Sequence, residues 1–404
     1  MTIDLEALYT DLHRHPELSF QETRTAGIAA GHLRELGLDV EEGVGITGVV
    51  AVLQNGDGPV VWARADMDAL PVEELTGLAY ASTATGIDPA GHAVPIMHAC
   101  GHDMHVTAMI GAVEKLVAER ATWSGTLVVL IQPAEEYGAG SRAMLDDGIL
   151  QRYPKPDIVL GQHVTPLPAG MVGMRPGPQM AAADGIIVTL HGRGGHGSRP
   201  HTTIDPVVMA AATVMRLQTI TSREIEPQDV AVVSVGSIHA GTKSNIIAAE
   251  AKLELSLRYS TDEMREKVLA SVERIVRAEA MASGAEREPE FHTEHTLPPT
   301  INDPDATARV TSAINRALGE GTVIDPGMLT GSEDVSWFAR DAGAPLVFWF
   351  WGGVDAAEYA AAVEKDTVSS DIPTNHSPYF APVAHPTIEV GVSAMVAAVR
   401  EFLG

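Results

Sequence analysis

The sequence predicts an α/β protein with a mostly parallel sheet, interrupted by an inserted ferredoxin-like α+β domain. Outside the insertion, apolar strands alternate with helical patterns and are followed by acidic or histidine residues, which is typical of a parallel sheet. Inside it, the predicted order β-α-β-β-α-β is that of the ferredoxin-like arrangement. In this chain of 404 residues we therefore expect one domain from residues 1–178 and 293–404 and another from residues 179–292.

Composition and charge indicate which binding partners and which compartment to expect for this protein. The chain has 53 acidic and 27 basic side chains, giving a formal net charge of -26. This charge argues against binding to nucleic acid or to anionic membranes. No apolar run approaches the length of a membrane span, and the acidic N-terminus lacks the features of a signal peptide. Together with the single cysteine, these features predict a cytoplasmic protein.

The chain begins with helices and continues with strands. Apolar residues recur at helical spacing over residues 5–36, and Pro16 divides this region into two predicted helices. Residues 45–53 and 59–65 are rich in β-branched side chains, and the Asn55-Gly56-Asp57-Gly58 sequence between them is a strong turn signal. We expect a pair of strands there.

Three predicted strands, at residues 59–65, 126–131 and 157–161, are followed by side chains that can bind a metal ion. The open α/β sheets of enzymes place their chemistry at the carboxyl ends of their strands. We therefore expect a site along this edge of the sheet. The side chains are Asp66 and Asp68, Glu135 and Glu136, and His163.

Residues 97–105 combine one thiol, three imidazoles and one carboxylate. Cys100 is the only cysteine, so it cannot form an intrachain disulfide, and His102 two residues later indicates a metal site. The alternative for Cys100 is packing as a small buried apolar residue. From Val106 onward the apolar residues follow a helical face, which gives Asp103 the alternative role of a helix cap.

The remaining elements complete the two domains. Trp349 and Trp351 lie in an apolar strand and are expected in the core. Ser332-Glu333-Asp334 is expected to cap a helix rather than to form a catalytic pair. The insertion is predicted to contain strands 183–190, 230–238, 251–257 and 289–295 with helices 205–219 and 261–282, and it is followed by helix 304–318, strand 345–351 and helix 386–403.

The polar residues at strand ends and in glycine-rich loops form one set, large enough to hold two divalent ions. Its thiol and imidazole groups favour Zn, Mn, Co or Ni over Mg or Ca. Two metal ions about 3.5–4 Å apart can activate a water and polarise a carbonyl, which is the chemistry of amide hydrolysis. One carboxylate must then remain off the metals to transfer the proton. The set is Asp66, Asp68, Cys100, His102, Glu135, Glu136, His163 and His376.

Six motifs in this order resemble those of the M20 metallopeptidases, and within them the amidohydrolase subgroup that contains hippurate hydrolases and auxin–amino-acid conjugate hydrolases. The resemblance covers essentially the whole chain. The wider peptidase branch has a His-x-Asp motif where this chain has Asp66-Met67-Asp68, and Cys100 favours the subgroup. The motifs are Arg64–Pro71, Met97–Asp103, Gln132–Glu136, Gly161–His163, Gly194–His201 and Asn375–Pro378.

The resemblance implies roles for individual residues. Glu135 would act as general base and then general acid, and Asp68 would orient an imidazole. His98, His105 and His201 would have packing or supporting roles. Which group bridges the metals stays open. The implied ligands of two divalent ions are Cys100, His102, Glu136, His163 and His376.

The resemblance also implies that the inserted domain is a lid and a homodimerisation domain. His196, in a glycine-rich loop, would stabilise the oxyanion, in this family often across the dimer interface. Asn245 and Arg258 would contact the carbonyl and the carboxylate of the substrate. The alternatives are a loop imidazole without a role for His196 and ordinary surface positions for the other two.

The function expected from the sequence is metal-dependent cleavage of the amide bond of N-acyl amino acids or similar small amides. A dipeptidase or carboxypeptidase of the same family is the first alternative, and it would have to recognise a free α-amino group. A hydrolase with Cys100 as its nucleophile is the second, and a binding protein without activity is the third.

Overall fold

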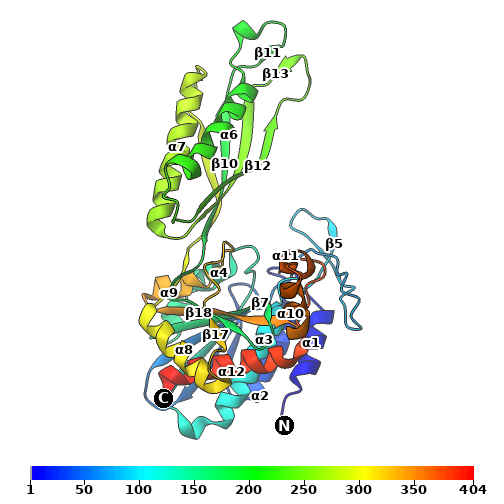
Figure 1. Ribbon diagram of the computed structural model, residues 1–404, viewed down its shortest axis with the longest axis vertical. Helices are drawn as coiled ribbons and strands as arrows, with labels where there is room; N and C mark the ends of the chain where they lie inside the picture. The colour runs from blue at the N-terminus through cyan, green and yellow to red at the C-terminus, as the bar shows by residue number, and fades with distance from the viewer. Residues whose placement is uncertain (1) are drawn as a thin grey trace. The chain divides into compact units, whose positions relative to one another are not determined.

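The computed structural model describes residues 2–404, and the chain divides into two compact units (Figure 1). The first unit extends from the N-terminal region to Gln179 and resumes over Ile301–Gly327 and Asp334–Gly404. The second unit consists of Met180–Thr300 and Met328–Glu333. Within residues 2–404, no helix has both the length and the apolar character needed to cross a membrane.

The first unit is built on an eight-stranded mixed sheet with the strand order β1-β2-β6-β3-β7-β18-β8-β17. Its central strands β6, β3, β7 and β18 are parallel, whereas β1 and β2 are antiparallel to their neighbours. The mostly parallel α/β sheet is therefore confirmed. The strands are β1 (Asp39–Val44), β2 (Gly48–Asn55), β3 (Val60–Asp66), β6 (Gly125–Gln132), β7 (Ile158–Pro168), β8 (Val172–Gly173), β17 (Val323–Ile324) and β18 (Leu346–Val354).

Strands β2 and β3 form as expected, but they do not pair with each other. Strand β6 lies between them, so the Asn55–Gly58 turn does not close a hairpin. The turn carries the chain across the start of β6, where Thr126 N donates to Pro59 O at 2.9 Å. This approach requires a glycine, because a Cβ atom on Gly125 would lie 2.5 Å from the same carbonyl oxygen. The fully buried, apolar β6 thereby gains a partner on both edges.

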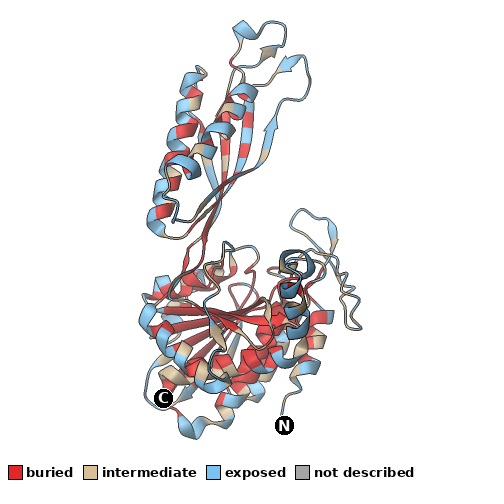
Figure 2. Cartoon of the chain, in the orientation of Figure 1, coloured by how far each residue is buried: buried red, intermediate tan, exposed pale blue. Residues whose placement is uncertain are grey.

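Helices cover both faces of this sheet, and its strands are buried along most of their length (Figure 2). Five helices share the larger core, which includes Trp349 and Trp351 with no exposed surface, as expected. On the opposite face, the ring of Trp62 packs against Phe338 of α9. The five core helices are α1 (Leu5–Arg14), α2 (Thr23–Glu35), α3 (His102–Ala118), α8 (Pro304–Leu318) and α12 (Ala384–Leu403). The remaining helices are α4 (Gly140–Asp146), α5 (Ile149–Arg152), α9 (Ser336–Ala342), α10 (Ala356–Glu364) and α11 (Val368–Asp371). The short strands outside the main sheet are β4 (Thr85–Ile87), β5 (Ala93–Pro95), β9 (Gly177–Met180) and β16 (Thr300–Asn302).

The second unit has the element order β-α-β-β-α-β and a four-stranded antiparallel sheet in the order β12-β14-β10-β15. Alternate residues of β14 are buried, because helices α6 and α7 pack with this sheet in one core. Strand β15 continues to Leu297, so the unit extends beyond the expected boundary at residue 292. The elements are β10 (Ala182–His191), α6 (Pro206–Arg223), β12 (Ala231–Ala240), β14 (Glu250–Tyr259), α7 (Asp262–Ala282) and β15 (Glu290–Leu297), with the short strands β11 (Gly195–His196) and β13 (Ile246–Ile247).

One helix cap expected from the sequence, and one considered as an alternative, are not formed. Helix α9 begins at Ser336 with Val335 at its N-cap, so Ser332-Glu333-Asp334 does not cap it. Asp334 is instead buried, and it accepts hydrogen bonds from Gln132 Nε2 at 2.7 Å and from Ser141 N at 3.0 Å. At the start of α3, the N-cap position is occupied by Gly101, and Asp103 lies in the first turn.

Candidate metal centre

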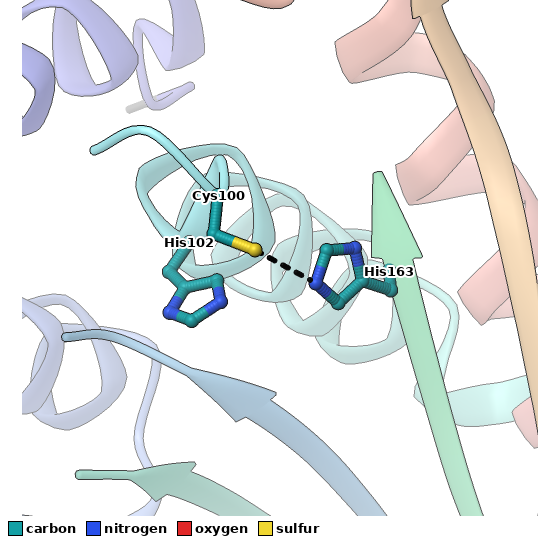
Figure 3. A group of neighbouring side chains, drawn as sticks. All are labelled: Cys100, His102 and His163. Carbon is teal, nitrogen blue, oxygen red and sulfur yellow. Dashed lines mark hydrogen bonds between the residues drawn. The ribbon is translucent and has the colours of Figure 1, made fainter. Parts of the chain in front are cut away.

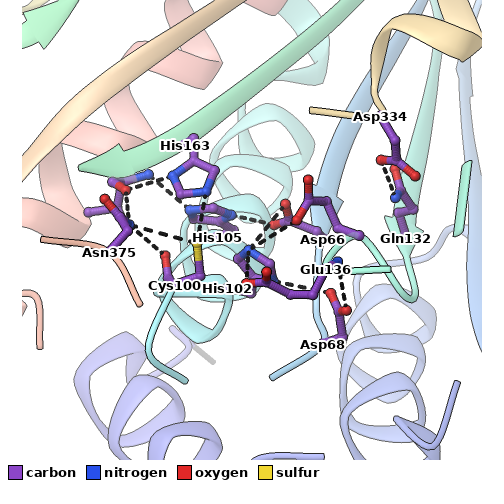
Figure 4. A network of polar contacts seen from close by, with 12 residues as sticks. Asp66, Asp68, Cys100, His102, His105, Gln132, Glu136, His163, Asp334 and Asn375 are labelled. Atoms are coloured by element: carbon purple, nitrogen blue, oxygen red, sulfur yellow. Dashed lines mark hydrogen bonds and ion pairs between the residues drawn. The ribbon is translucent and has the colours of Figure 1, made fainter. Parts of the chain in front are cut away.

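The structure brings the six residues expected at the metal centre together in three overlapping groups. Figure 4 shows four of them, Cys100, His102, Glu136 and His163. Within each group, one potential ligand atom per residue lies within 4.8 Å of the others. The residues come from the start of α3, the turn after β6, the middle of β7 and the loop before α12. The groups are Cys100, His102 and His163; Cys100, Glu136 and His376; and His102, Glu135 and Glu136.

Cys100 and His163 face each other, with 3.4 Å between Sγ and Nε2 (Figure 3). Gly101 allows this approach, because its φ is +82° and a Cβ atom there would lie 2.4 Å from a methyl carbon of Val164. His163 was expected after the end of its strand, but β7 continues to Pro168 because β18 pairs with it well beyond this residue. Its Nδ1 atom donates to Val164 O at 2.6 Å, which leaves Nε2 available to a metal.

Glu135 and Glu136 lie in the turn that follows β6. Glu136 Oε1 is 3.8 Å from His102 Nε2, and Glu136 Oε2 is 3.4 Å from His376 Nε2. Glu135 Oε2 is 4.0 Å from the same His102 atom. The buried Glu22 of the N-terminal region supports this turn by accepting a hydrogen bond from Ala134 N at 2.9 Å. No local sequence pattern indicated Glu22, because the contact spans 112 positions.

Two buried atoms in this group lack the partners that buried polar atoms normally have. Neither His102 Nε2 nor Glu136 Oε1 forms a hydrogen bond with any of residues 2–404. Leaving such atoms unsatisfied is costly, whereas coordination to a cation would satisfy both. Thiol, imidazole and carboxylate ligands together suit a borderline divalent ion such as Zn or Mn. The residues present therefore fit the metal ions that the sequence implies.

Asp68 determines which nitrogen of His102 faces the other ligands. Its Oδ1 atom lies 3.2 Å from His102 Nδ1, and its Oδ2 atom accepts from Ser19 Oγ at 2.6 Å and from Glu136 N at 3.1 Å. Because a carboxylate only accepts, His102 carries a proton on Nδ1 and directs Nε2 toward Glu136. This geometry is the one expected of a residue that orients an imidazole.

The pKa values of the metal-free site favour bound protons. Burial lowers the pKa of His102, but the carboxylates of Asp66 and Asp68 outweigh it and raise the pKa to about 10. Burial raises the pKa of Glu136 to about 8. Burial, reinforced by the nearby glutamates, raises the pKa of the Cys100 thiol well above its usual value. A metal ion that binds here must therefore displace protons.

Asp66 also borders the candidate ligands, since its Oδ2 atom is 3.6 Å from His102 Nε2 and it forms a further candidate group with His102 and His105. Its Oδ2 atom pairs with Arg64 Nη1 at 2.7 Å, and its Oδ1 atom accepts from His105 Nδ1. Arg64 has no exposed surface, and it also pairs with Asp334 at 3.2 Å. The sequence contained a signal for the first pair, because residues two apart in a strand share one face. It contained none for Asp334, which is 270 positions away.

His98 and His105 are both buried beside the ligands. His105 Nε2 accepts from Val164 N at 2.9 Å, so this ring connects α3 with β7. Burial lowers the pKa of His98 to about 4, and neither of its ring nitrogens has a hydrogen-bond partner in the described chain.

The second unit brings together two of its three predicted site residues. His196 pairs with Ile246 in the β11–β13 ribbon, and Gly197 N donates to Asn245 O at 2.9 Å, so His196 and Asn245 are close neighbours. Both are exposed. Arg258 is half-buried near the opposite end of β14, where its Nη1 donates to Leu257 O. His201 lies in the 3-10 turn Pro200–Thr202 of the same unit.

Comparisons with known proteins agree with this architecture. Residues 62–399 match the model of peptidase family M20/M25/M40. Thermostable carboxypeptidase 1 of Saccharolobus solfataricus is 37% identical over 346 residues, which cover 84% of each chain. Hippurate hydrolase of Campylobacter jejuni is 34% identical over 340 residues, covering 83% of this chain and 85% of the relative.

A solved structure from Bacillus subtilis, described as a dinuclear metal-binding peptidase of the M20 family, superimposes with a TM-score of 0.79. It is 30% identical, and the match covers 98% of each chain. The family match spans far more than half of the sequence, and the relatives named above act on amide or peptide bonds. The chain therefore belongs to peptidase family M20/M25/M40 and is a hydrolase.

Proposed function

We propose that this protein is a binuclear metal-dependent amidohydrolase that releases the acyl group from N-acyl amino acids or similar small amides. The observation that supports it most is the unsatisfied pair of buried atoms, His102 Nε2 and Glu136 Oε1, beside a second glutamate. The proposed ligands are Cys100, His102, Glu136, His163 and His376.

When bound, two divalent ions would lower the pKa of a water and polarise the amide carbonyl. Asp68 would keep His102 in the tautomer that presents Nε2, and the Val164 carbonyl would do the same for His163. Both imidazoles would therefore bind a metal ion without a change of tautomer.

Glu135 is the proposed general base and acid. Glu136 lies near both His102 and His376, so it is the glutamate proposed to bind metal. Glu135 lies near His102 alone of these two, so it is the carboxylate proposed to remain off the metals. Glu135 would take a proton from the attacking water and pass it to the departing amine.

The second unit is proposed to supply His196 and Asn245 across a homodimer. Ser198 N donates to His196 Nδ1 at 3.1 Å, so the neutral ring carries its proton on the exposed Nε2 atom, where it can donate to an oxyanion. Arg258 lies eight residues along β14 from Glu250, a span of about 27 Å. One small substrate therefore cannot contact Arg258 together with His196 and Asn245 of the same chain. It could contact Arg258 of one chain and His196 and Asn245 of another.

Mixing subunits tests this sharing directly. His196→Ala and Glu135→Gln chains are each expected to be inactive alone, and subunit exchange between them should restore part of the activity. No recovery in a verified mixed dimer would contradict a shared site.

A substrate panel tests the proposed reaction. The metal-loaded protein is expected to hydrolyse N-acetyl, N-benzoyl or longer N-acyl amino acids and to discriminate against dipeptides with a free α-amino group. The reverse preference would support the dipeptidase or carboxypeptidase alternative. The similarity to a carboxypeptidase is the reason to include dipeptides in the panel. Metal-loaded protein inert toward the whole panel would support a binding protein.

The thiol-nucleophile alternative is disfavoured by the site itself. Cys100 is buried, and its pKa is raised well above the usual value, whereas a nucleophilic cysteine needs a lowered pKa. Activity that survives complete metal removal would restore this alternative.

A further inference from the structure

The side-chain amide of Asn375 connects three segments that carry proposed metal ligands (Figure 4). Its Nδ2 atom lies 3.1 Å from Cys100 O and 3.2 Å from Val164 O. Val164 follows the ligand His163, and Asn375 itself precedes the ligand His376. One amide group thus links the start of α3, strand β7 and the C-terminal ligand loop at residues 375–378.

This C-terminal ligand loop needs such a link more than the other ligand segments do. The side chain of His376 is 57% exposed, whereas that of Glu136 is 6% exposed and that of His102 is fully buried. The imidazole of His376 therefore has little surrounding packing to hold it. Its backbone also has a φ of +71°, which is unfavourable for a residue other than glycine and persists only when the surroundings enforce it.

The contacts of the loop show how its position is enforced. His376 N donates to Ala99 O at 2.8 Å, and Leu75 N donates to Pro378 O at 2.8 Å. These backbone bonds attach the loop to α3 and to the region after β3. The Asn375 amide adds an attachment to β7 through Val164 O.

The Val164 carbonyl also accepts the Nδ1 proton of His163 at 2.6 Å. Asn375 and the His163 ring therefore share one acceptor, so the orientation of this peptide group affects two ligands at once. The amide nitrogen of Asn375 has two protons and three acceptors within reach, because Nδ2 also lies 3.8 Å from Cys100 Sγ, and together these contacts fix the plane of the side chain.

We propose that Asn375 is a positioning residue that sets the spacing of Cys100, His163 and His376 and thereby strengthens divalent-metal binding. It acts through the backbone of the ligand segments and through its contact with Cys100 Sγ, and its amide nitrogen donates no electron pair to the metal. This inference rests on the proposed metal site and adds a residue to it that is not a ligand.

The test is the Zn²⁺ affinity of metal-depleted protein, measured by competition with a chromogenic chelator. Asn375→Ala is expected to bind at least one of two Zn²⁺ equivalents about 10- to 100-fold more weakly than the unaltered chain. Asn375→Leu keeps a similar branched shape and removes both donor protons, so the same loss is expected. It also carries the test if the alanine variant does not fold.

Asn55 provides a matched control in the same unit. Its Nδ2 atom also bridges two carbonyls, those of Arg120 at 2.7 Å and Trp123 at 2.6 Å, but at the opposite end of β6 from the glutamate turn. Asn55→Ala should lower the melting temperature and leave Zn²⁺ affinity unchanged.

The outcomes separate this inference from the proposed function. Wild-type Zn²⁺ affinity in both Asn375 variants would overturn the positioning role while leaving the metal site intact. An equal loss of affinity in Asn55→Ala would also overturn it, because general destabilisation would then explain the effect. Failure of the unaltered chain to bind Zn²⁺ would instead overturn the metal site itself.

Discussion

His102 Nε2 lies 3.8 Å from Glu136 Oε1, and both atoms are buried without a hydrogen-bond partner among residues 2–404. Their chain positions differ by 34, and they come from a helix start and from the turn after a neighbouring strand. Folding also places carboxylate oxygens of Asp66 and Glu135 at 3.6 Å and 4.0 Å from His102 Nε2, yet within the described chain it gives neither atom of the pair a hydrogen bond. A single bound cation would satisfy both atoms.

The adjacent glutamates should separate metal binding from proton transfer. Glu135→Gln is expected to retain metal and to lose about 10²- to 10⁴-fold in kcat, because the proton carrier is removed. Glu136→Gln should lose metal first, because its carboxylate faces His102 and His376. Metal content and steady-state kinetics of both variants provide the check, and unchanged kcat in Glu135→Gln would remove it as the base.

Metal affinity should rise with pH. The raised pKa values of Cys100, His102 and Glu136 mean that the metal-free site holds protons at neutral pH, and these must leave when a metal binds. Each displaced proton contributes about tenfold in affinity per pH unit, so Zn²⁺ titrations between about pH 6 and pH 8 should show at least this slope. Cys100→Ala should bind less metal and show a shallower slope. Full occupancy in Cys100→Ala would assign Cys100 to packing.

His13 should make stability depend on pH above neutrality. It is buried between Asp103, at 2.6 Å, and Glu74, at 3.1 Å; burial lowers its pKa, but these carboxylates raise it from 6.5 to about 9. A raised pKa in the folded protein stabilises it fully below pH 6.5, and this contribution is lost as the pH rises through 9. Relative to His13→Gln, the unaltered chain should be more stable by about 3 kcal/mol near pH 6, where Asp103 and Glu74 are ionised, and the difference should shrink as the pH rises toward 9.

The measurement is urea denaturation at several pH values. His385 offers a control, since it also pairs with two carboxylates, those of Glu389 and Glu6, but its side chain is 54% exposed. His385→Gln should change the unfolding free energy little at any pH. A pH-independent difference for His13→Gln would show that the ion pairs do not cause its effect.

Asp334 should prove structural although it does not cap a helix. Asp334→Ala leaves the buried Arg64 guanidinium without one of its carboxylate partners, and breaking such a pair costs about 3–5 kcal/mol. Ser332→Ala, at the position expected to begin the cap, should be nearly neutral. Thermal melts of the two variants provide the check, and an equally small effect of Asp334→Ala would show that its pair with Arg64 contributes little to stability.

The residues of the metal centre were predictable because their chemical types carry the information. Cys100, His102 and the paired glutamates are uncommon together. The glutamates follow an apolar strand and Cys100 and His102 lie at the start of a helix, and a sequence pattern reveals both elements. The structure places them together with His163 and His376. Their roles as ligands stay predictions until a metal is measured.

Other features depend on contacts that a sequence pattern does not encode. The Asn55–Gly58 turn has the local chemistry of a hairpin. The apolar strand β6 instead lies between β2 and β3 and pairs with one of them on each edge. The Arg64–Asp334 pair joins distant segments, so it becomes visible only when the sheet is assembled. Local propensity yields to tertiary packing in both cases.

Reconstitution of metal-depleted protein tests the account most directly. Stepwise addition of Zn²⁺ or Mn²⁺ should restore hydrolysis of an N-acyl amino acid until two ions are bound per chain, and Glu136→Gln should fail to recover under the same conditions. Full hydrolysis by the metal-depleted protein, or none after two ions are bound, would contradict a binuclear amidohydrolase.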